Sequence, residues 1–278
     1  MRILTTSLLC LAVAACGNDS PSGADLGSGV RELILNFRAQ FGDEALDCAN
    51  SYENIGIGKE HIHVGDYRMY VHDLRLVTAA GVERPLRLVP DGAWQSAEVA
   101  LLDFTTNTDE CTGDAAVHTA LKVRYDDDGA ALKGLRFRVG VPFAQNHQDA
   151  ARAAAPLNRS ELFWSWNSGY KFLMLEGKNH VDTEYLFHLG STGCMKDANN
   201  TVTSCSAPNR LAVDLPTFDP QRSAVIFDVK ALLTGVNLDN AVSCHSSSAE
   251  ADCKLLFSNL GLPLGGVDPK PTAVFRAE

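Results

Sequence analysis

Residues 163–172 read Phe163-Trp164-Ser165-Trp166-Asn167-Ser168-Gly169-Tyr170-Lys171-Phe172. In an extended strand, Trp164 and Trp166 lie on one face, because successive side chains alternate between the two faces. Tryptophan is large, and its indole is readily oxidised. The pair therefore indicates either an anchor of a β-sheet core or a site of chemistry. Apolar side chains of the same parity continue on both sides of the pair, which predicts one central core strand over residues 162–175.

Short apolar or alternating runs, separated by turn residues, continue along most of the chain. This pattern predicts an all-β fold, an antiparallel β-sandwich-like single domain with disulfide-stapled loops. One or two short helices are expected, at residues 229–233 and near residues 252–259. Asp126-Asp127-Asp128-Gly129 has the composition of a turn and predicts a hairpin. Strands are expected at residues 32–37, 67–77, 98–104, 118–125, 134–141, 162–175, 184–189, 210–215 and 224–229.

Residues 1–29 are expected to export and tether the protein. Residues 1–15 combine a basic start with an apolar run that is too short to cross a bilayer, and they end just before Cys16. This arrangement predicts a signal peptide cleaved so that Cys16 becomes lipidated. A flexible tether would follow over residues 16–29, and one domain over residues 30–278. Because Gly17 is not acidic, we expect an outer-membrane lipoprotein that faces the periplasm or the cell surface.

Charge and cysteine content narrow the class of protein further. The 278 residues include 24 Lys and Arg against 34 Asp and Glu, a net charge of −10 that argues against a nucleic-acid partner. Of the 8 cysteines, Cys10 falls in the signal and Cys16 carries lipid. The remaining cysteines are even in number, which predicts disulfides in an exported protein. Pairing nearest neighbours in the sequence gives Cys48–Cys111, Cys194–Cys205 and Cys244–Cys253. No Cys-x-x-Cys spacing points to a zinc ribbon, a thioredoxin-type motif or attached haem.

The histidines are candidate metal ligands, because metal sites in exported proteins are often built from imidazole. His61-Ile62-His63 places two imidazoles on one face of a strand. His147 lies in a loop before the tryptophan segment and His188 in a strand after it, so these two histidines can converge on that segment. For each of them, a solvated or hydrogen-bonded histidine is the plainer alternative. Motifs of serine hydrolases, zinc proteases and phosphate-binding loops do not occur in the sequence.

Several further motifs occur together with the tryptophan segment in a fixed order. They are Tyr67-Arg68-Met69-Tyr70-Val71, Ala100-Leu101-Leu102-Asp103-Phe104, Gly140-Val141-Pro142-Phe143, Asn146-His147, Pro156-Leu157-Asn158, Phe187-His188-Leu189-Gly190-Ser191-Thr192-Gly193-Cys194 and Thr272-Ala273-Val274-Phe275-Arg276. From about residue 30 to residue 276, this ordered set resembles the MbnP-like proteins, also called the metallo-mystery pair four-Cys-motif family.

The resemblance implies a specific function. Family members are exported proteins that act with a dihaem protein of the cytochrome c peroxidase/MauG type, which oxidises the first tryptophan of a Trp-x-Trp motif to kynurenine. The modified protein then binds a single copper ion as Cu(I), in contexts of copper homeostasis. In this chain the oxidised residue would be Trp164, with Trp166 unmodified. We expect His147 and His188 to be the imidazole ligands. The reserve candidates are His61, His63 and His72.

The expected protein is therefore a copper-binding lipoprotein and not an enzyme. Its oxidation by a haem partner requires that Trp164, or a relay through Trp166, lie near the surface. Two alternatives of other classes stay open. One is a disulfide-stapled β-sandwich that binds a protein or a glycan without metal, with the tryptophans as contact or core residues. The other is a metal-dependent hydrolase built on His61 and His63.

Overall fold

The computed structural model describes residues 29–165, 167–266, 268–271 and 273–278. The expected signal peptide and most of the expected tether therefore lie outside the described residues, as does Trp166. Gly29, the last residue assigned to the tether, already begins the first strand.

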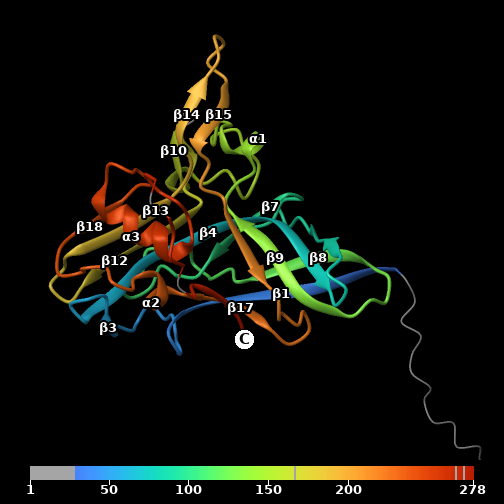
Figure 1. The fold of residues 1–278 in the computed structure, drawn as a ribbon, viewed down its shortest axis with the longest axis horizontal. Helices are drawn as coiled ribbons and strands as arrows, with labels where there is room; N and C mark the ends of the chain where they lie inside the picture. Colours follow the sequence, from blue (N-terminus) through green and yellow to red (C-terminus); the bar gives the residue numbers. More distant parts are fainter. Residues whose placement is uncertain (1–28, 166, 267, 272) are drawn as a thin grey trace, which may run out of the picture.

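Two main sheets contain most of the strands in the described chain (Figure 1). The first has the strand order β19-β17-β1-β8-β6, with β2 also paired to β1. Its strands are β1 (Gly29–Phe41), β2 (Glu44–Ala45), β6 (Arg87–Leu88), β8 (Ala120–Asp127), β17 (Ala224–Asp228) and β19 (Phe275–Ala277).

The second sheet has the order β16-β9-β4-β12-β13-β18 and is organised around the 19-residue strand β4. Strands β3, β5 and β7 also pair with β4. Most neighbours in both sheets are antiparallel, whereas β1–β17 and β13–β18 are parallel pairs. The strands of the second sheet are β3 (Tyr52–Ile55), β4 (Glu60–Thr78), β5 (Glu83–Pro85), β7 (Val99–Asp103), β9 (Leu132–Val139), β12 (Leu173–Asn179), β13 (Glu184–Leu189), β16 (Leu211–Leu215) and β18 (Val242–Cys244).

The core lies between these two sheets. Phe37 of β1 meets Phe137 of β9 edge to face, with ring centroids 5.8 Å apart. Tyr67 of β4 packs against Phe227 of β17 at 4.8 Å. All four rings are buried, and each pair joins one sheet to the other. The predicted all-β, sandwich-like fold is therefore confirmed.

Short helices and two hairpins complete the described fold. The helices are α1 (Phe143–Asn146), the 3₁₀ turn η1 (Ser160–Leu162), α2 (Val229–Leu232) and α3 (Ala251–Leu260). Two of them, α2 and α3, lie at the predicted positions. None of the helices in the described ranges is long and apolar enough to cross a bilayer. The hairpins are β10 (Phe163–Ser165) with β11 (Gly169–Tyr170), and β14 (Thr192–Lys196) with β15 (Val202–Ala207).

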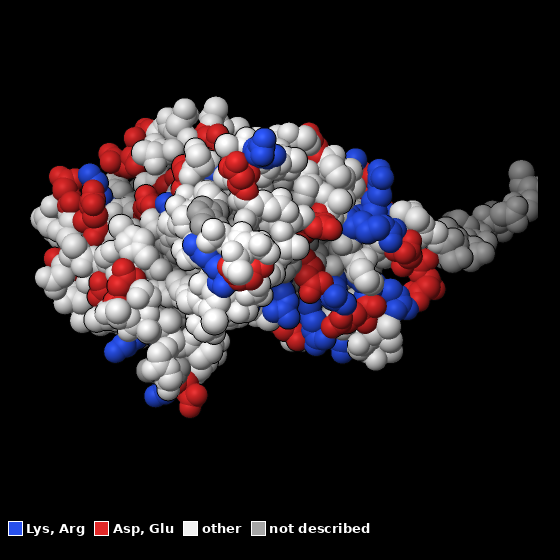
Figure 2. All heavy atoms as spheres, turned by 90° about the horizontal axis from the view of Figure 1, so that it is seen from above, with Lys and Arg blue, Asp and Glu red and all other residues white. Residues whose placement is uncertain are grey.

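The two hairpins and α1 stand together above the sandwich in Figure 1. Seen from above, Lys and Arg side chains concentrate, interleaved with Asp and Glu, toward the end at which β8 and β9 lie (Figure 2). The ion pairs there include Arg84–Asp128, Arg87–Asp126 and Arg136–Asp214.

The prediction of one continuous strand over residues 162–175 is wrong. The chain folds back after β10, so that Phe163 pairs with Tyr170 and Ser165 with Gly169. Ser165 Oγ accepts a hydrogen bond from the backbone N–H of Ser168 at 3.2 Å, and Gly169 has a φ of +82°, which glycine adopts without strain. The apolar residues that alternate over residues 162–175 therefore belong to two short strands, the turn between them and the start of a third strand.

The predicted hairpin at residues 126–129 is also wrong. Asp127 Oδ1 accepts a hydrogen bond from the N–H of Gly129, as expected for a turn. However, β8 before the turn pairs with β1 in the first sheet, while β9 after it pairs with β4 in the second. The turn chemistry reverses the chain, but it does not determine which sheet the next strand joins.

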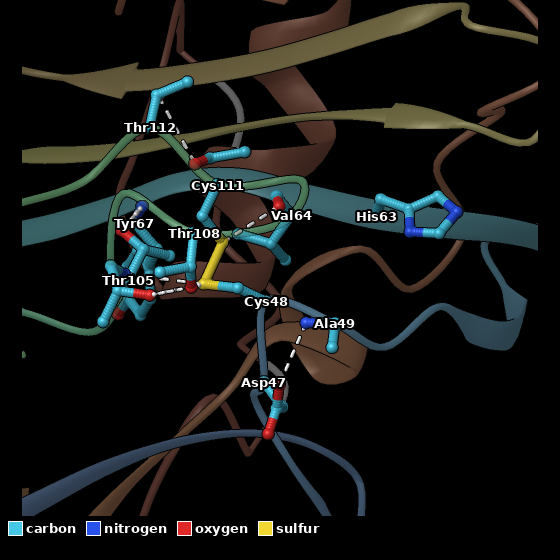
Figure 3. Close-up of a disulfide and its surroundings, with 12 residues drawn as sticks. Asp47, Cys48, Ala49, His63, Val64, Tyr67, Thr105, Thr108, Cys111 and Thr112 are labelled. Atoms are coloured by element: carbon cyan, nitrogen blue, oxygen red, sulfur yellow. Dashed lines mark hydrogen bonds between the residues drawn. A yellow bond between two sulfur atoms is a disulfide. The ribbon is translucent and has the colours of Figure 1, made fainter.

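The described residues form three disulfides, with the pairing favoured by proximity in the sequence. Cys48–Cys111 ties the segment after β2 to the loop after β7 (Figure 3). Cys194–Cys205 links β14 to β15, and Cys244–Cys253 links β18 to α3. In Figure 3, His63 lies farther along β4 and points away from the first disulfide.

Candidate functional site

Trp164 is half-buried on β10, the first strand of the β10–β11 hairpin. Its six-membered ring lies against Gly190, directly after β13. A Cβ atom on Gly190 would overlap Cζ3 of Trp164, so only glycine leaves room for the indole there. The close approach of Gly190 therefore fixes Trp164 over the end of β13 while part of its surface stays accessible.

His188 is the buried imidazole beneath this tryptophan. It lies on β13, is 5% exposed, and its ring centroid is 6.2 Å from that of Trp164. Its Nε2 is hydrogen-bonded to Oε1 of Glu176 on the neighbouring strand β12. A carboxylate only accepts, so Nε2 carries the proton and the lone pair is on Nδ1. That Nδ1 atom is buried and has no hydrogen-bond partner.

The electrostatics of this pair favour a neutral imidazole beside a charged carboxylate. Burial lowers the pKa of His188, and the hydrogen bond from His188 lowers the pKa of Glu176. A neutral His188 with an available nitrogen is the form that binds a metal ion. A carboxylate that holds the other nitrogen is a common arrangement behind metal-bound histidine.

Met174 lies directly across the β12–β13 ladder from His188. Side chains at such paired positions are on the same face of the sheet and close together. Met174 is 3% exposed, and its Sδ accepts a hydrogen bond from Lys171 Nζ at 3.3 Å. The same ammonium lies 3.9 Å from Glu176 Oε1, and burial lowers the pKa of Lys171. A thioether thus accompanies the imidazole.

His245 contributes a second imidazole, directly after β18. Its ring centroid is 5.1 Å from that of His188, and the two rings are nearly perpendicular. His245 Nδ1 lies 3.0 Å from Glu250 Oε1, which orients the ring. The side chain is 43% exposed, so this histidine is on the solvent side of His188. We refer to Trp164, Met174, His188 and His245 as the Trp164 cluster.

A cleft leads from the surface to one side of this cluster. Its volume is about 420 Å³, and Met174, Glu176 and Lys171 line it together with Asp66, Arg68, Thr112, Gly113, Asp114 and Glu161. Arg68 is buried and forms ion pairs with Asp66 and Glu161. A small ion therefore has a polar route to the Met174 side of the cluster.

His147, the other predicted imidazole ligand, belongs to a different group of side chains. It caps α1, with Nε2 at 3.2 Å from Asn146 Nδ2 and 3.6 Å from Cys205 Sγ. Its ring also contacts Phe143 at 5.1 Å. The structure therefore places His147 against the Cys194–Cys205 disulfide and His188 beneath Trp164.

The reserve histidines on β4 have different surroundings. His61 is exposed and lies 5.9 Å, ring to ring, from His180, with Glu53 3.8 Å from its Nδ1. His63 is half-buried and lines a cavity of about 330 Å³ together with Glu110 and Glu184. The imidazole that contacts His61 is thus that of His180, in the turn after β12, a contact that the His-x-His spacing did not indicate.

His72 is buried near the middle of β4. It is 7% exposed, and its Nε2 has no hydrogen-bond partner. Burial, together with the nearby charge of Arg210, lowers the pKa of His72 to about 4. At neutral pH this side chain is therefore an uncharged core imidazole, at a position of β4 that pairs with Val99 of β7 and Arg138 of β9.

The third tryptophan has a different environment from Trp164. Trp94 is stacked on His118 with ring centroids 5.0 Å apart, and the Arg159 guanidinium lies 4.7 Å above its ring. A cation over an indole stabilises the neutral ring and opposes removal of an electron from it. Of the two described tryptophans, Trp94 thus has a guanidinium over its ring. No such contact is found for Trp164 among the described residues.

Met174 and His245 are the site residues that sequence reasoning missed. Met174 is one of the apolar residues of the predicted core strand over residues 162–175, and its position opposite His188 follows only from the β12–β13 register. His245 is 57 residues from His188 in sequence and reaches it through the parallel β13–β18 pair. Thioether and imidazole are donors that suit Cu(I), so the donor set fits that ion.

The fold and the cluster together define a class of protein: a disulfide-bonded β-sandwich that places soft donors beneath a half-buried tryptophan. The MbnP family model matches residues 30–246, and the chain belongs to the MbnP family. This confirms the resemblance seen in the motifs. The structure is similar to that of MbnP from Methylosinus trichosporium, with a TM-score of 0.75 and 26% sequence identity. The match covers 90% of this chain and 98% of that chain. Among curated proteins, none matches the sequence.

Proposed function

We propose that this protein is an exported, lipid-anchored Cu(I)-binding protein of copper homeostasis. Its site is completed when a dihaem partner of the cytochrome c peroxidase/MauG type oxidises Trp164 to kynurenine. The protein is the substrate of that enzyme and the carrier of the metal. The observation that supports this most directly is the buried His188 Nδ1, which has no partner while Nε2 is held by Glu176.

The remaining candidate donors belong to side chains beside the His188 ring. Met174 supplies a thioether from the paired position on β12, and His245 supplies a second imidazole 5.1 Å away, ring to ring. Cu(I) tolerates a low coordination number and prefers such soft or imidazole donors. Kynurenine at position 164 would add an aniline nitrogen and a ketone oxygen where the indole offers only one N–H donor.

The oxidation of Trp164 is balanced with hydrogen peroxide as the oxidant of the haem partner. Two molecules of peroxide accept four electrons and become two molecules of water, while the C2–C3 bond of the indole is cleaved and each carbon gains an oxygen atom. The product is N-formylkynurenine. Water then hydrolyses the formamide, which releases formate and leaves kynurenine. The half-buried position of Trp164 satisfies the need for electron transfer near the surface.

The test is to co-express the full chain with the dihaem protein and to analyse the tryptic peptide of residues 160–171, which trypsin releases after Arg159 and Lys171. We expect fragment ions to show loss of one carbon and gain of one oxygen at Trp164, and not at Trp166. Copper should co-purify only with modified chains. Trp94 is an internal control, because the Arg159 guanidinium over its ring opposes oxidation.

Trp164→Phe is the matched variant, since it keeps an aromatic ring over Gly190 but cannot form kynurenine. We expect it to retain the fold, measured by its unfolding transition, and to lose copper. An unmodified Trp164 in the presence of active partner, together with copper-free protein, would return the chain to the class of metal-free binding modules.

The anchor has its own test. Cys16→Ser should abolish incorporation of labelled fatty acid and release the protein from the membrane fraction, because covalent acylation is what retains the chain there. Unchanged membrane retention of this variant would contradict a lipoprotein.

A further inference from the structure

We propose that the Cys194–Cys205 disulfide is a reversible redox element, and that after reduction Cys194, Cys205 and His147 form a second site for a soft metal ion such as Cu(I). The three ligand atoms (Cys194 Sγ, Cys205 Sγ and a ring nitrogen of His147) lie within 4.8 Å of one another. This site does not include Trp164 or His188, and it does not depend on kynurenine.

The first argument is accessibility. Cys194 and Cys205 are half-buried, whereas Cys48 and Cys111 are 8% and 6% exposed and Cys244 and Cys253 are fully buried. Thiol–disulfide exchange requires a nucleophile to reach a sulfur atom. Among the three disulfides, a reductant therefore meets Cys194–Cys205 first.

The second argument is that the ends of this disulfide stay together after reduction. Cys194 and Cys205 occupy directly opposed positions on the β14–β15 hairpin, between the Thr192–Ala207 and Met195–Ser204 pairs. The ladder thus holds the two sulfur atoms on one face of the hairpin without the covalent bond. The hairpin is a separate two-stranded sheet, so opening the bond leaves the pairing of both main sheets in place (Figure 1).

The third argument is the orientation of His147. Its Nε2 faces Cys205 Sγ at 3.6 Å and lies 3.2 Å from Asn146 Nδ2. The Asn146 amide is fixed, because its Oδ1 accepts a hydrogen bond from the N–H of Tyr170 and its nitrogen is therefore the atom beside His147. An amide N–H is a donor, so the lone pair of His147 is on Nε2, and a metal ion bound there would take the place of the Asn146 N–H.

The chemistry balances with a dithiol as reductant. Exchange with a dithiol transfers two electrons and two protons to the disulfide, which yields two Cys thiols here and a disulfide in the reductant. Binding of Cu(I) then releases protons from the thiols, because the thiolate is the ligand. Two thiolates and one imidazole are a donor set that selects soft ions.

The first part of the test locates the reducible disulfide. The full chain is treated with a limiting concentration of dithiothreitol, without denaturant, and the thiols are alkylated and mapped by mass spectrometry. We expect label on Cys194 and Cys205 before any label on the four buried cysteines. Equal or earlier labelling of Cys244 or Cys48 would overturn the proposal.

The second part measures metal binding in the Trp164→Phe background, so that the result is independent of kynurenine. Oxidised and reduced protein are titrated with Cu(I) against a chromophoric chelator. We expect reduction to add one tightly bound equivalent of Cu(I). The double variant Cys194→Ser with Cys205→Ser should lack this additional equivalent. His147→Ala should shift the competition toward the chelator. No gain on reduction, or a gain that survives in the double variant, would overturn the proposal.

Wild-type protein alkylated at Cys194 and Cys205 provides a test that does not depend on the folding of the double variant. Protein that has been reduced and alkylated only at Cys194 and Cys205 has both sulfurs blocked, and we expect it to bind no additional Cu(I). Full retention of the extra equivalent after alkylation would exclude these thiols as ligands.

Discussion

At the scale of the residue, the two nitrogens of His188 have different roles. Glu176 binds Nε2 and thereby selects the tautomer, while Nδ1 stays unpaired in the interior. An unpaired buried polar atom costs free energy, so its retention points to a ligand that is bound in the working protein. Glu176 is thus a positioning residue in the proposed copper site.

Glu176→Gln tests that role. The amide can also present its NH₂ group to Nε2, so the preference for the Nδ1 lone pair is lost along with the negative charge. We expect copper affinity of the modified protein to fall by about 10–100-fold, measured by chelator competition. Glu184→Gln, an exposed position on β13, is the control and should leave the affinity unchanged. Equal affinities for both variants would contradict the assigned role.

Gly190→Ala tests the packing of the Trp164 indole against Gly190. The added Cβ would overlap the indole, so we expect Trp164 to move outward and the free energy of unfolding to fall by about 1–3 kcal/mol. Kynurenine yield and copper content should fall with it. Gly29→Ala is the control, because its Cβ would meet nothing within 4 Å. Normal modification of the Gly190 variant would show that the position of the indole is not critical.

The sequence indicated part of this site and could not indicate the rest. Trp164 and His188 stand out because they belong to ordered motifs. Met174 becomes a neighbour of His188 only through the register of β12 on β13, and His245 only through the parallel pairing of β18. Pairing between strands is decided by packing over the whole sheet, and no local pattern in the sequence contains it.

At the scale of the element, α1 and the β10–β11 hairpin are joined by Asn146. This side chain is fully buried, accepts a hydrogen bond from the N–H of Tyr170 at 3.0 Å, and fills the space beside Gly169. Asn146 therefore links the segment that carries His147 to the turn that follows Trp164.

Asn146→Ala should weaken that link. The backbone N–H of Tyr170 would stay buried without its acceptor, which costs about 1–3 kcal/mol of unfolding free energy. We also expect faster amide exchange at Tyr170 and a lower yield of kynurenine. Gln148→Ala, an exposed neighbour, is the control. A denaturant titration in which both variants match the wild type would contradict the structural role of Asn146.

Local patterns predicted the strands well where the chain alternates between buried and exposed residues. In β8, for instance, exposed and buried side chains alternate without exception. The same reasoning failed over residues 162–175, because Ser165 and Gly169 form a turn that the apolar count ignores. It also failed at residues 126–129, since a turn signal carries no information about the sheet that receives the next strand.

At the scale of the whole molecule, two buried groups shape the response to acid in opposite directions. His72 has its pKa lowered to about 4 by burial, so the folded state resists a proton that the unfolded chain binds near pH 6.5. Stability from this group is lost as the pH falls from about 6.5 to about 4. Burial raises the pKa of Asp103 to about 6, so this group adds stability as the pH falls below 6.

His72→Leu should separate the two contributions. It removes an imidazole whose Nε2 has no partner and keeps an apolar side chain in the core. When the pH is lowered from 7 to 4, the variant should lose up to about 3 kcal/mol less unfolding free energy than the wild type. Urea titrations at both pH values measure this difference. An identical acid response in the two proteins would show that His72 is not the group that titrates.

The contact between Lys171 and Met174 has a consequence for which ion the proposed site accepts. The Lys171 ammonium donates to Met174 Sδ and lies 3.9 Å from Glu176 Oε1, so the positive charge of Lys171 already lies beside the thioether. Entry of Cu(I) with withdrawal of the ammonium replaces one monovalent cation by another and leaves the local charge balance unchanged. A divalent ion would leave one surplus charge in the same confined volume. The site would thus discriminate between oxidation states of copper by the net charge that it can hold, as well as by ligand type.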